Sequence, residues 1–130
     1  MIRFSHTIFY VSDVLKTLQF YEAAFGFKAK FIHESNAYAE LMTGEVLLAF
    51  ASEELGDMNL PEGFLRNNLK SLPQACEIAF TTDDPENLYK QAVKAGATEL
   101  SSPQQKPWGQ IVGYVRDPNG ILIEIAGELE

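Results

Sequence analysis

The chain carries the same predicted order of elements twice: a strand, a helix and three further strands. Asp13 and Asp84 each stand where the N-cap of a helix is expected, and they lie 71 positions apart. Gly26 and Gly96, which are placed to end those two helices, are separated by one position fewer. One copy alone cannot bury its sheet face, so the two copies are expected to combine into one fold.

Hydrophobic periodicity places the elements of the first copy. The helix between Asp13 and Gly26 has apolar residues three or four positions apart. In the strands, successive residues alternate between the two faces. The predicted strands cover residues 4–11, 27–33, 37–42 and 46–51.

The second copy follows a segment rich in Gly and Pro, residues 53–74, which is expected to be a linker or lid with some helical turns. Pro85 suits the first position of the second helix. The predicted strands of this copy cover residues 77–82 and 98–100 and, after a loop at 103–109, the two arms of a hairpin within 110–125.

These patterns predict an α+β fold of two βαβββ modules that close into one curved mixed sheet around a ligand cavity. We expect a single domain over residues 1–130, with module one at about 1–52, the linker at about 53–74 and module two at about 75–130.

Charge and composition exclude several classes of function. Ten Lys and Arg against eighteen Asp and Glu give a net charge of −8, so nucleic acid and membranes are poor partners and a neutral or cationic small molecule is favoured. No apolar run has transmembrane length, and we expect no N-terminal leader. The single Cys76 excludes an internal disulfide and favours a reducing, cytoplasmic location.

Glu124 is an ionisable residue within a strand that otherwise favours burial. Ile123 and Ile125 point to one face of that strand, and Glu124 points to the other. A carboxylate in such a strand is expected to have a partner. His6 and Glu77, at equivalent positions of the two first strands, are the candidates, because the repeat would bring all three residues into the curved sheet.

One imidazole and two carboxylates form a suitable donor set for a divalent metal such as Mn²⁺, Fe²⁺, Ni²⁺ or Zn²⁺. Three protein ligands, His6, Glu77 and Glu124, would leave positions open for water or substrate. Without a metal, repulsion and burial should raise the pKa of one of the two Glu residues, with His6 as counterion. An acid–base pair or a structural polar cluster is then the alternative.

Three aromatic residues, Phe50, Phe64 and Trp108, are candidates for the wall of a substrate pocket, although ordinary packing also accounts for such residues. Trp108 lies on the loop before the last hairpin, and Phe64 lies in the linker. Glu40 alternates with Ala39 and Leu41 in a strand, which allows it to face inward or outward, and we expect it to face solvent.

Several motifs resemble those of the vicinal oxygen chelate superfamily, which includes glyoxalases, bleomycin-resistance proteins and extradiol dioxygenases. The resemblance covers nearly the whole chain, and the Asp-Pro-Asn-Gly turn followed by a strand Glu is its most specific part. The segment Lys106-Pro-Trp-Gly-Gln110 resembles a glyoxalase-like branch of unassigned activity. The other motifs are residues 6–13, 20–21, 25–27, 95–97 and 114–124.

The resemblance implies a divalent metal on the inner strands and a homodimer whose sites often combine both chains. His6 matches the ligand on the first strand of module one, and Glu124 matches a last-strand Glu that can also act as a catalytic base. Two positions depart from the pattern. Glu77 stands where His is usual, and Leu48 or Ala49 stands where glyoxalase I enzymes carry an acid, which leaves a four-ligand lyase site incomplete.

Two functions follow as hypotheses. The first is a glyoxalase-like metalloenzyme that chelates adjacent substrate oxygens on a divalent metal for lyase- or isomerase-type chemistry. The alternative is a metal-free protein of the bleomycin-resistance type that sequesters a small cationic compound. The acidic net charge and the missing fourth ligand favour the second hypothesis, and the three aligned polar residues favour the first.

Overall fold

The computed structural model describes residues 1–129, which form two units. The first unit comprises Met1–Glu22 and Gly26–Arg66, and the second comprises Ala23–Phe25 and the chain from Asn67 onward. The division falls within the segment expected to be a linker. Each unit contains one four-stranded mixed sheet and the same order of elements, so the predicted α+β fold of two βαβββ modules is confirmed.

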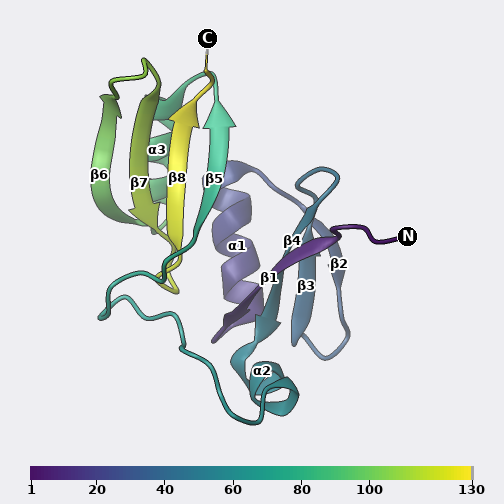
Figure 1. Ribbon diagram of the computed structural model, residues 1–130. Helices are drawn as coiled ribbons and strands as arrows, with labels where there is room; N and C mark the ends of the chain where they lie inside the picture. The colour runs from purple at the N-terminus through teal and green to yellow at the C-terminus, as the bar shows by residue number, and fades with distance from the viewer. Residues whose placement is uncertain (130) are drawn as a thin grey trace. The chain divides into compact units, whose positions relative to one another are not determined.

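In the first unit the sheet order is β1-β4-β3-β2, with β1 parallel to β4 and the other pairs antiparallel (Figure 1). A parallel pair needs a long crossover, which α1, β2 and β3 provide. The bounds of the elements are β1 His6–Val11, α1 Val14–Phe25, β2 Ala29–Ile32, β3 Tyr38–Leu41, β4 Leu47–Ser52 and α2 Glu53–Asn59.

Helix α1 begins and ends where the sequence indicated. The Asp13 side chain accepts a hydrogen bond from the backbone N–H of Lys16, and Gly26 ends the helix in the left-handed conformation with φ of 76°. The helix covers one face of the sheet, where Tyr21 packs on Phe50 with ring centroids 5.0 Å apart. The opposite face carries His6.

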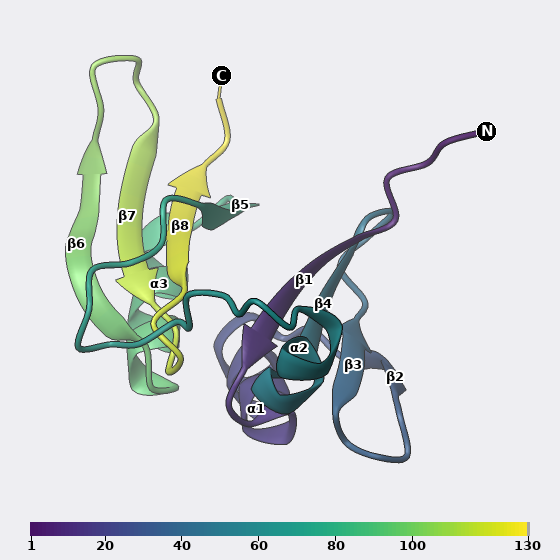
Figure 2. The same ribbon diagram turned by 60° about the horizontal axis from the view of Figure 1, so that its bottom comes forward.

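In the second unit the sheet order is β5-β8-β7-β6, with α3 against one face (Figure 2). The parallel pair is β5 and β8, which corresponds to the parallel pair β1 and β4 of the first unit. The bounds of the elements are β5 Glu77–Thr82, α3 Pro85–Lys94, β6 Thr98–Gln105, β7 Ile111–Arg116 and β8 Leu122–Gly127.

One expectation about local structure was wrong. Strand β6 runs to Gln105 instead of ending near residue 100, and it includes Pro103. Proline is tolerated there because β6 is an edge strand, and the β6–β7 register shifts on either side of Ser101. The helical turns expected within residues 53–74 are found at the start of that segment as helix α2, whose N-cap Ser52 accepts from Leu55 N–H.

The side chain of Arg116 fixes the start of the second unit. Its guanidinium donates to the backbone carbonyls of Asn68, Ser71 and Gly120 at 3.0, 2.8 and 3.0 Å. The neighbouring Asp117 is fully buried and accepts from the backbone N–H groups of the turn that follows it. The segment from Asn68 to Ser71 is therefore tied to the β7–β8 turn by a single buried cation.

Candidate functional site

The strand register gives His6 and Glu77 the same place in the two units. His6 pairs with Leu47, the first residue of β4, and Glu77 pairs with Leu122, the first residue of β8. Both pairs are parallel. The equivalence expected from the sequence repeat is therefore a property of the sheets as well.

The same register settles which residue replaces the missing acid of the first unit. Glu124 pairs with Ala79 on β5, and Ala49 pairs with Ile8 at the matching position on β1. The counterpart of Glu124 is thus Ala49, which is fully buried, and Leu48 lies on the opposite face. The first unit has no carboxylate at this strand position.

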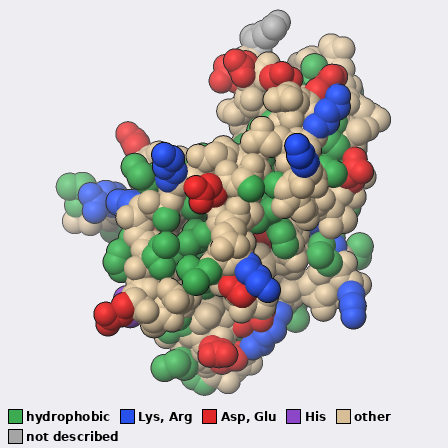
Figure 3. All heavy atoms as spheres, turned by 180° about the vertical axis from the view of Figure 1, so that it is seen from behind, with side chains coloured by type: hydrophobic (Ala, Val, Ile, Leu, Met, Phe, Trp, Pro, Cys, Tyr) green, Lys and Arg blue, Asp and Glu red, His purple; other side chains and the backbone are tan. Residues whose placement is uncertain are grey.

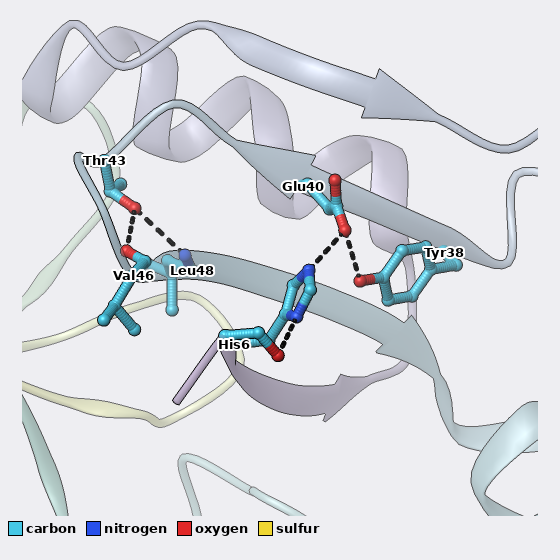
Figure 4. A network of polar contacts seen from close by, with 7 residues as sticks. His6, Tyr38, Glu40, Thr43, Val46 and Leu48 are labelled. Carbon is cyan, nitrogen blue, oxygen red and sulfur yellow. Dashed lines mark hydrogen bonds and ion pairs between the residues drawn. The ribbon is translucent and has the colours of Figure 1, made fainter. Parts of the chain in front are cut away.

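A carboxylate from the next strand reaches His6 instead. Glu40 on β3 pairs with Ala49, and its Oε2 lies 2.7 Å from Nε2 of His6 on β1 (Figure 4). Tyr38 donates its hydroxyl proton to the same oxygen at 2.8 Å. Because Ala49 has only a methyl group, it leaves room for the Glu40 side chain to extend over β4 toward His6.

These contacts hold Glu40 in its ionised form. The hydrogen bond from Tyr38 is the largest cause that lowers the pKa of Glu40, and His6 and Lys30 lower it further against the effect of burial. Burial and the Glu40 charge together raise the pKa of Tyr38 to about 12. The second ring nitrogen of His6, Nδ1, lies 2.8 Å from the Ser5 hydroxyl, so both nitrogens have partners.

The expectation that Glu40 faces solvent was wrong, and the sequence analysis did not identify Tyr38. The side chain of Glu40 is only 15% exposed. The available signal was the alternation of Tyr38 and Glu40 with Ala39 and Leu41, both of which are buried. This alternation places Tyr38 and Glu40 on one face, but it does not show that the face also carries His6.

In the second unit, Glu77 and Glu124 lie on the same face of neighbouring strands, because Glu77 pairs with Leu122, two residues before Glu124. Burial, and then the charge of Glu124, raise the pKa of Glu77. Tyr114 on β7 pairs directly with Glu124 and donates a hydrogen bond to its Oε1 at 3.0 Å. Within residues 1–129, no Lys or Arg side chain forms an ion pair with either carboxylate.

The three aromatic candidates have different environments. Phe50 is fully buried against Tyr21, on the helix-covered face of its sheet. Phe64 packs on Tyr10 with centroids 5.0 Å apart, and Tyr10 shares the open face of β1 with His6. Trp108 is 61% exposed, and its indole N–H donates to the side chain of Gln110.

A groove of about 650 Å³ lies on the open face of the first unit. Its lining includes His6 and Glu40, together with the cations Arg3 and Lys30 and the carboxylate of Glu45. Opposite charges are therefore balanced in this groove, which does not have the acidic lining that the net charge of the chain suggested.

Within each unit, and over residues 1–129, no group of three or more His, Cys, Asp and Glu side chains is placed to hold a metal ion. His6 belongs to the first unit, whereas Glu77 and Glu124 belong to the second. Their convergence on one metal stays a prediction.

The duplicated fold has a match among known protein families. A sequence profile of the Glyoxalase/Bleomycin resistance protein/Dioxygenase superfamily matches residues 3–125. The chain belongs to this superfamily. The match includes His6, Glu77 and Glu124, together with both βαβββ modules.

Two curated proteins are similar to this superfamily member. A 4-hydroxyphenylpyruvate dioxygenase of Dictyostelium discoideum is 28% identical over 131 residues, which cover 92% of this chain but only 31% of the dioxygenase. A virulence protein of Salmonella typhimurium is 27% identical over 128 residues, covering 95% of this chain and 83% of that protein. The chain therefore spans less than a third of the dioxygenase.

Solved structures share the fold of this superfamily member at low sequence identity. A glyoxalase-related enzyme from Fulvimarina pelagi is 20% identical with a TM-score of 0.83, covering 98% of this chain and 89% of that one. A superfamily enzyme from Burkholderia phytofirmans is 23% identical with a TM-score of 0.79, covering 97% of this chain and 98% of that one.

The surface of this superfamily member carries both signs of charge. On the face shown in Figure 3, Lys and Arg side chains are interspersed with Asp and Glu. None of the helices within residues 1–129 is long and apolar enough to cross a membrane.

Proposed function

We propose that this protein is a glyoxalase-like enzyme that binds a divalent metal through His6, Glu77 and Glu124 and acts on a small molecule by lyase- or isomerase-type chemistry. The observation that carries the proposal is the pair of neighbouring carboxylates, Glu77 and Glu124, which lack a cationic partner among residues 1–129. Two such carboxylates repel one another, and a bound cation would remove that repulsion.

The donor set fits a divalent ion of intermediate hardness, such as Mn²⁺, Fe²⁺, Ni²⁺ or Zn²⁺. When bound, such an ion supplies a Lewis acid that polarises adjacent oxygens of a substrate. His6 would have to release either Glu40 from Nε2 or Ser5 from Nδ1 to become a ligand. Among residues 1–129, Oε2 of Glu124 accepts no hydrogen bond and is available as a ligand atom.

Glu124 is the proposed base of the reaction, and Tyr114 is its positioning residue. The Tyr114 hydroxyl donates to Oε1 of Glu124, which fixes the carboxylate and leaves the other oxygen to accept a proton from substrate. Trp108 and Phe64 are proposed as pocket walls, because both are at least partly exposed. Phe50 has a core position and is not included among these wall residues.

Metal content tests this proposal. The protein is purified without added metal, loaded with each of the four ions in turn, desalted and measured by elemental analysis. We expect stoichiometric metal in the wild type and loss of it in Glu77→Ala and Glu124→Ala, whereas Glu34→Ala in an exposed turn should retain it. Stoichiometric metal in Glu77→Ala would remove Glu77 from the ligand set.

The second candidate is a metal-free protein that sequesters a small cationic compound. The same unpaired carboxylates, Glu77 and Glu124, favour it, since an organic cation would also relieve their repulsion. Absence of metal from the loaded wild type, together with salt-sensitive binding of an amine, would favour this candidate. In either case we propose a homodimer, which sedimentation measurements would test.

A further inference from the structure

The groove of the first unit has a charge pattern that the metal proposal does not use. It presents two cations, Arg3 and Lys30, and two carboxylates, Glu40 and Glu45, along one volume of about 650 Å³. Among residues 1–129, neither Arg3 nor Lys30 forms an ion pair within 4.0 Å. Both cations are therefore available to a ligand.

Lys30 lies at an irregularity of β2, next to Glu40 on β3. The β2–β3 register shifts between Ala29 and Phe31, so that Ala29 pairs with Leu41 while Phe31 pairs with Glu40. Such a bulge inserts an extra residue into one strand. Lys30 is that residue, and it lines the groove beside Glu40.

Glu40 also has one oxygen available. Both of its hydrogen bonds, from Tyr38 and with His6, use Oε2 (Figure 4). Among the residues that the structure describes, Oε1 has no hydrogen-bond partner. The carboxylate is thus held in place by His6 and Tyr38, and its free oxygen remains to accept from a ligand.

Apolar side chains complete the lining of the groove. Phe4, Val46 and Leu47 lie beside the charged residues, and Phe4 is 68% exposed. A ligand that fits this lining has an anionic group, a cationic or donor group, and an apolar portion of moderate size.

We propose that this groove binds a small zwitterion, a molecule with a carboxylate, a protonated amine and an apolar side chain. Lys30 and Arg3 contact the carboxylate, and Glu40 Oε1 accepts from the ammonium group. Charge-assisted hydrogen bonds of this kind are stronger than neutral ones. Lys30, Arg3 and Glu40 are not among the proposed metal ligands, so loss of binding to this groove and loss of the metal are separate results.

Three probes of matched shape test the proposal on the full-length protein: L-leucine, 4-methylpentanoate, which lacks the amine, and 3-methylbutylamine, which lacks the carboxylate. Binding is measured by titration of amide resonances, with metal content recorded for each sample. We expect leucine to bind at least about tenfold more tightly than either analogue, because each charge-assisted contact is worth about a factor of ten.

Two variants assign the contacts. Lys30→Gln should weaken leucine and 4-methylpentanoate about tenfold and leave the amine unaffected, whereas Glu40→Gln should weaken leucine and the amine. Lys28→Gln is the matched control, because Lys28 is exposed and does not line the groove. Absence of leucine binding, tighter binding of either analogue than of leucine, or equal losses in Lys30→Gln and Lys28→Gln would each overturn the proposal.

Discussion

Glu40 and His6 are joined across an intervening strand: Oε2 of Glu40 on β3 lies 2.7 Å from Nε2 of His6 on β1, with β4 between them. Glu40 pairs with Ala49 on β4, whose methyl group leaves room for the carboxylate, and His6 pairs with Leu47 two residues before Ala49 on the same face. The first unit has thus placed its carboxylate one strand away from the position that Glu124 occupies in the second unit.

Replacing Glu40 with Gln should make stability less dependent on pH. The folded-state pKa of Glu40 is lowered, so its ionised form stabilises the native state above the ordinary Glu pKa, and that stabilisation is lost as the pH falls through the lowered value. We expect Glu40→Gln to cost about 1 kcal/mol near neutral pH and much less in acid. Urea unfolding of the wild type and of Glu40→Gln at a series of pH values measures the cost at neutral and at acidic pH. A difference in the free energy of unfolding that is the same at every pH would contradict the prediction.

Tyr38 should ionise later than an ordinary tyrosine. Its pKa is raised from 10.0 to about 12, so the neutral hydroxyl stabilises the folded state below the unfolded value, and this contribution is lost as the pH rises through about 12. The wild-type protein is labelled at tyrosine carbons and titrated by NMR. At a pH about one unit above 10, the Tyr38 resonance should still have the chemical shift of the neutral phenol. In Glu40→Gln, Tyr38 should ionise at a lower pH than in the wild type. Tyr38→Phe assigns the resonance. A wild-type Tyr38 that ionises with the ordinary pKa of 10.0 would contradict the prediction.

Arg116 should contribute much more to stability than another arginine of the chain. It is 6% exposed, and it donates to carbonyls of Asn68, Ser71 and Gly120. Arg116→Met removes the guanidinium donors from those carbonyls, of which Asn68 keeps only the N–H of Ser71 as a donor, and should lower the free energy of unfolding by about 3 kcal/mol. Arg66→Met is the control, because the Arg66 side chain is 44% exposed and pairs with Asp57 and Glu53 at the surface, so its loss should cost less than about 1 kcal/mol.

Chemical denaturation compares the two arginine variants, and limited proteolysis reports on the segment from Asn68 to Ser71. We expect this segment to be cleaved faster in Arg116→Met than in Arg66→Met. Equal stability and equal cleavage of the two variants would show that Arg116 does not hold the segment.

Glu77→Gln should stabilise the metal-free protein at neutral pH. The pKa of Glu77 is raised in the folded protein, so protonated Glu77 stabilises the folded state below the ordinary Glu pKa. This stabilisation is lost as the pH rises through the folded-state pKa of Glu77. The wild type should therefore melt below Glu77→Gln at pH 7 with chelator present, and the difference should disappear in acid. Adding the metal identified by elemental analysis should reverse the order, because only the wild type keeps all proposed ligands. A melting order that metal leaves unchanged would count against Glu77 as a ligand.

Local signals in the sequence predicted much of the fold. Asp13 and Gly26 define α1 through contacts within one turn, and Gly26 adopts the positive φ that its role requires. The Asp117 turn was predicted for the same reason, since its hydrogen bonds join residues no more than four positions apart. In contrast, the extension of β6 through Pro103 depends on its being an edge strand, which is a property of the whole sheet.

The sequence by itself determined the duplicated βαβββ order, the equivalence of His6 with Glu77, and the placement of Glu124 on the face opposite Ile123 and Ile125. These features follow from spacing along one strand or helix, where geometry is fixed by the backbone period. Only the tertiary structure decided that Glu40 meets His6 and that Lys30 lines the groove. Both depend on which strands are neighbours, and such contacts join residues that no local pattern relates.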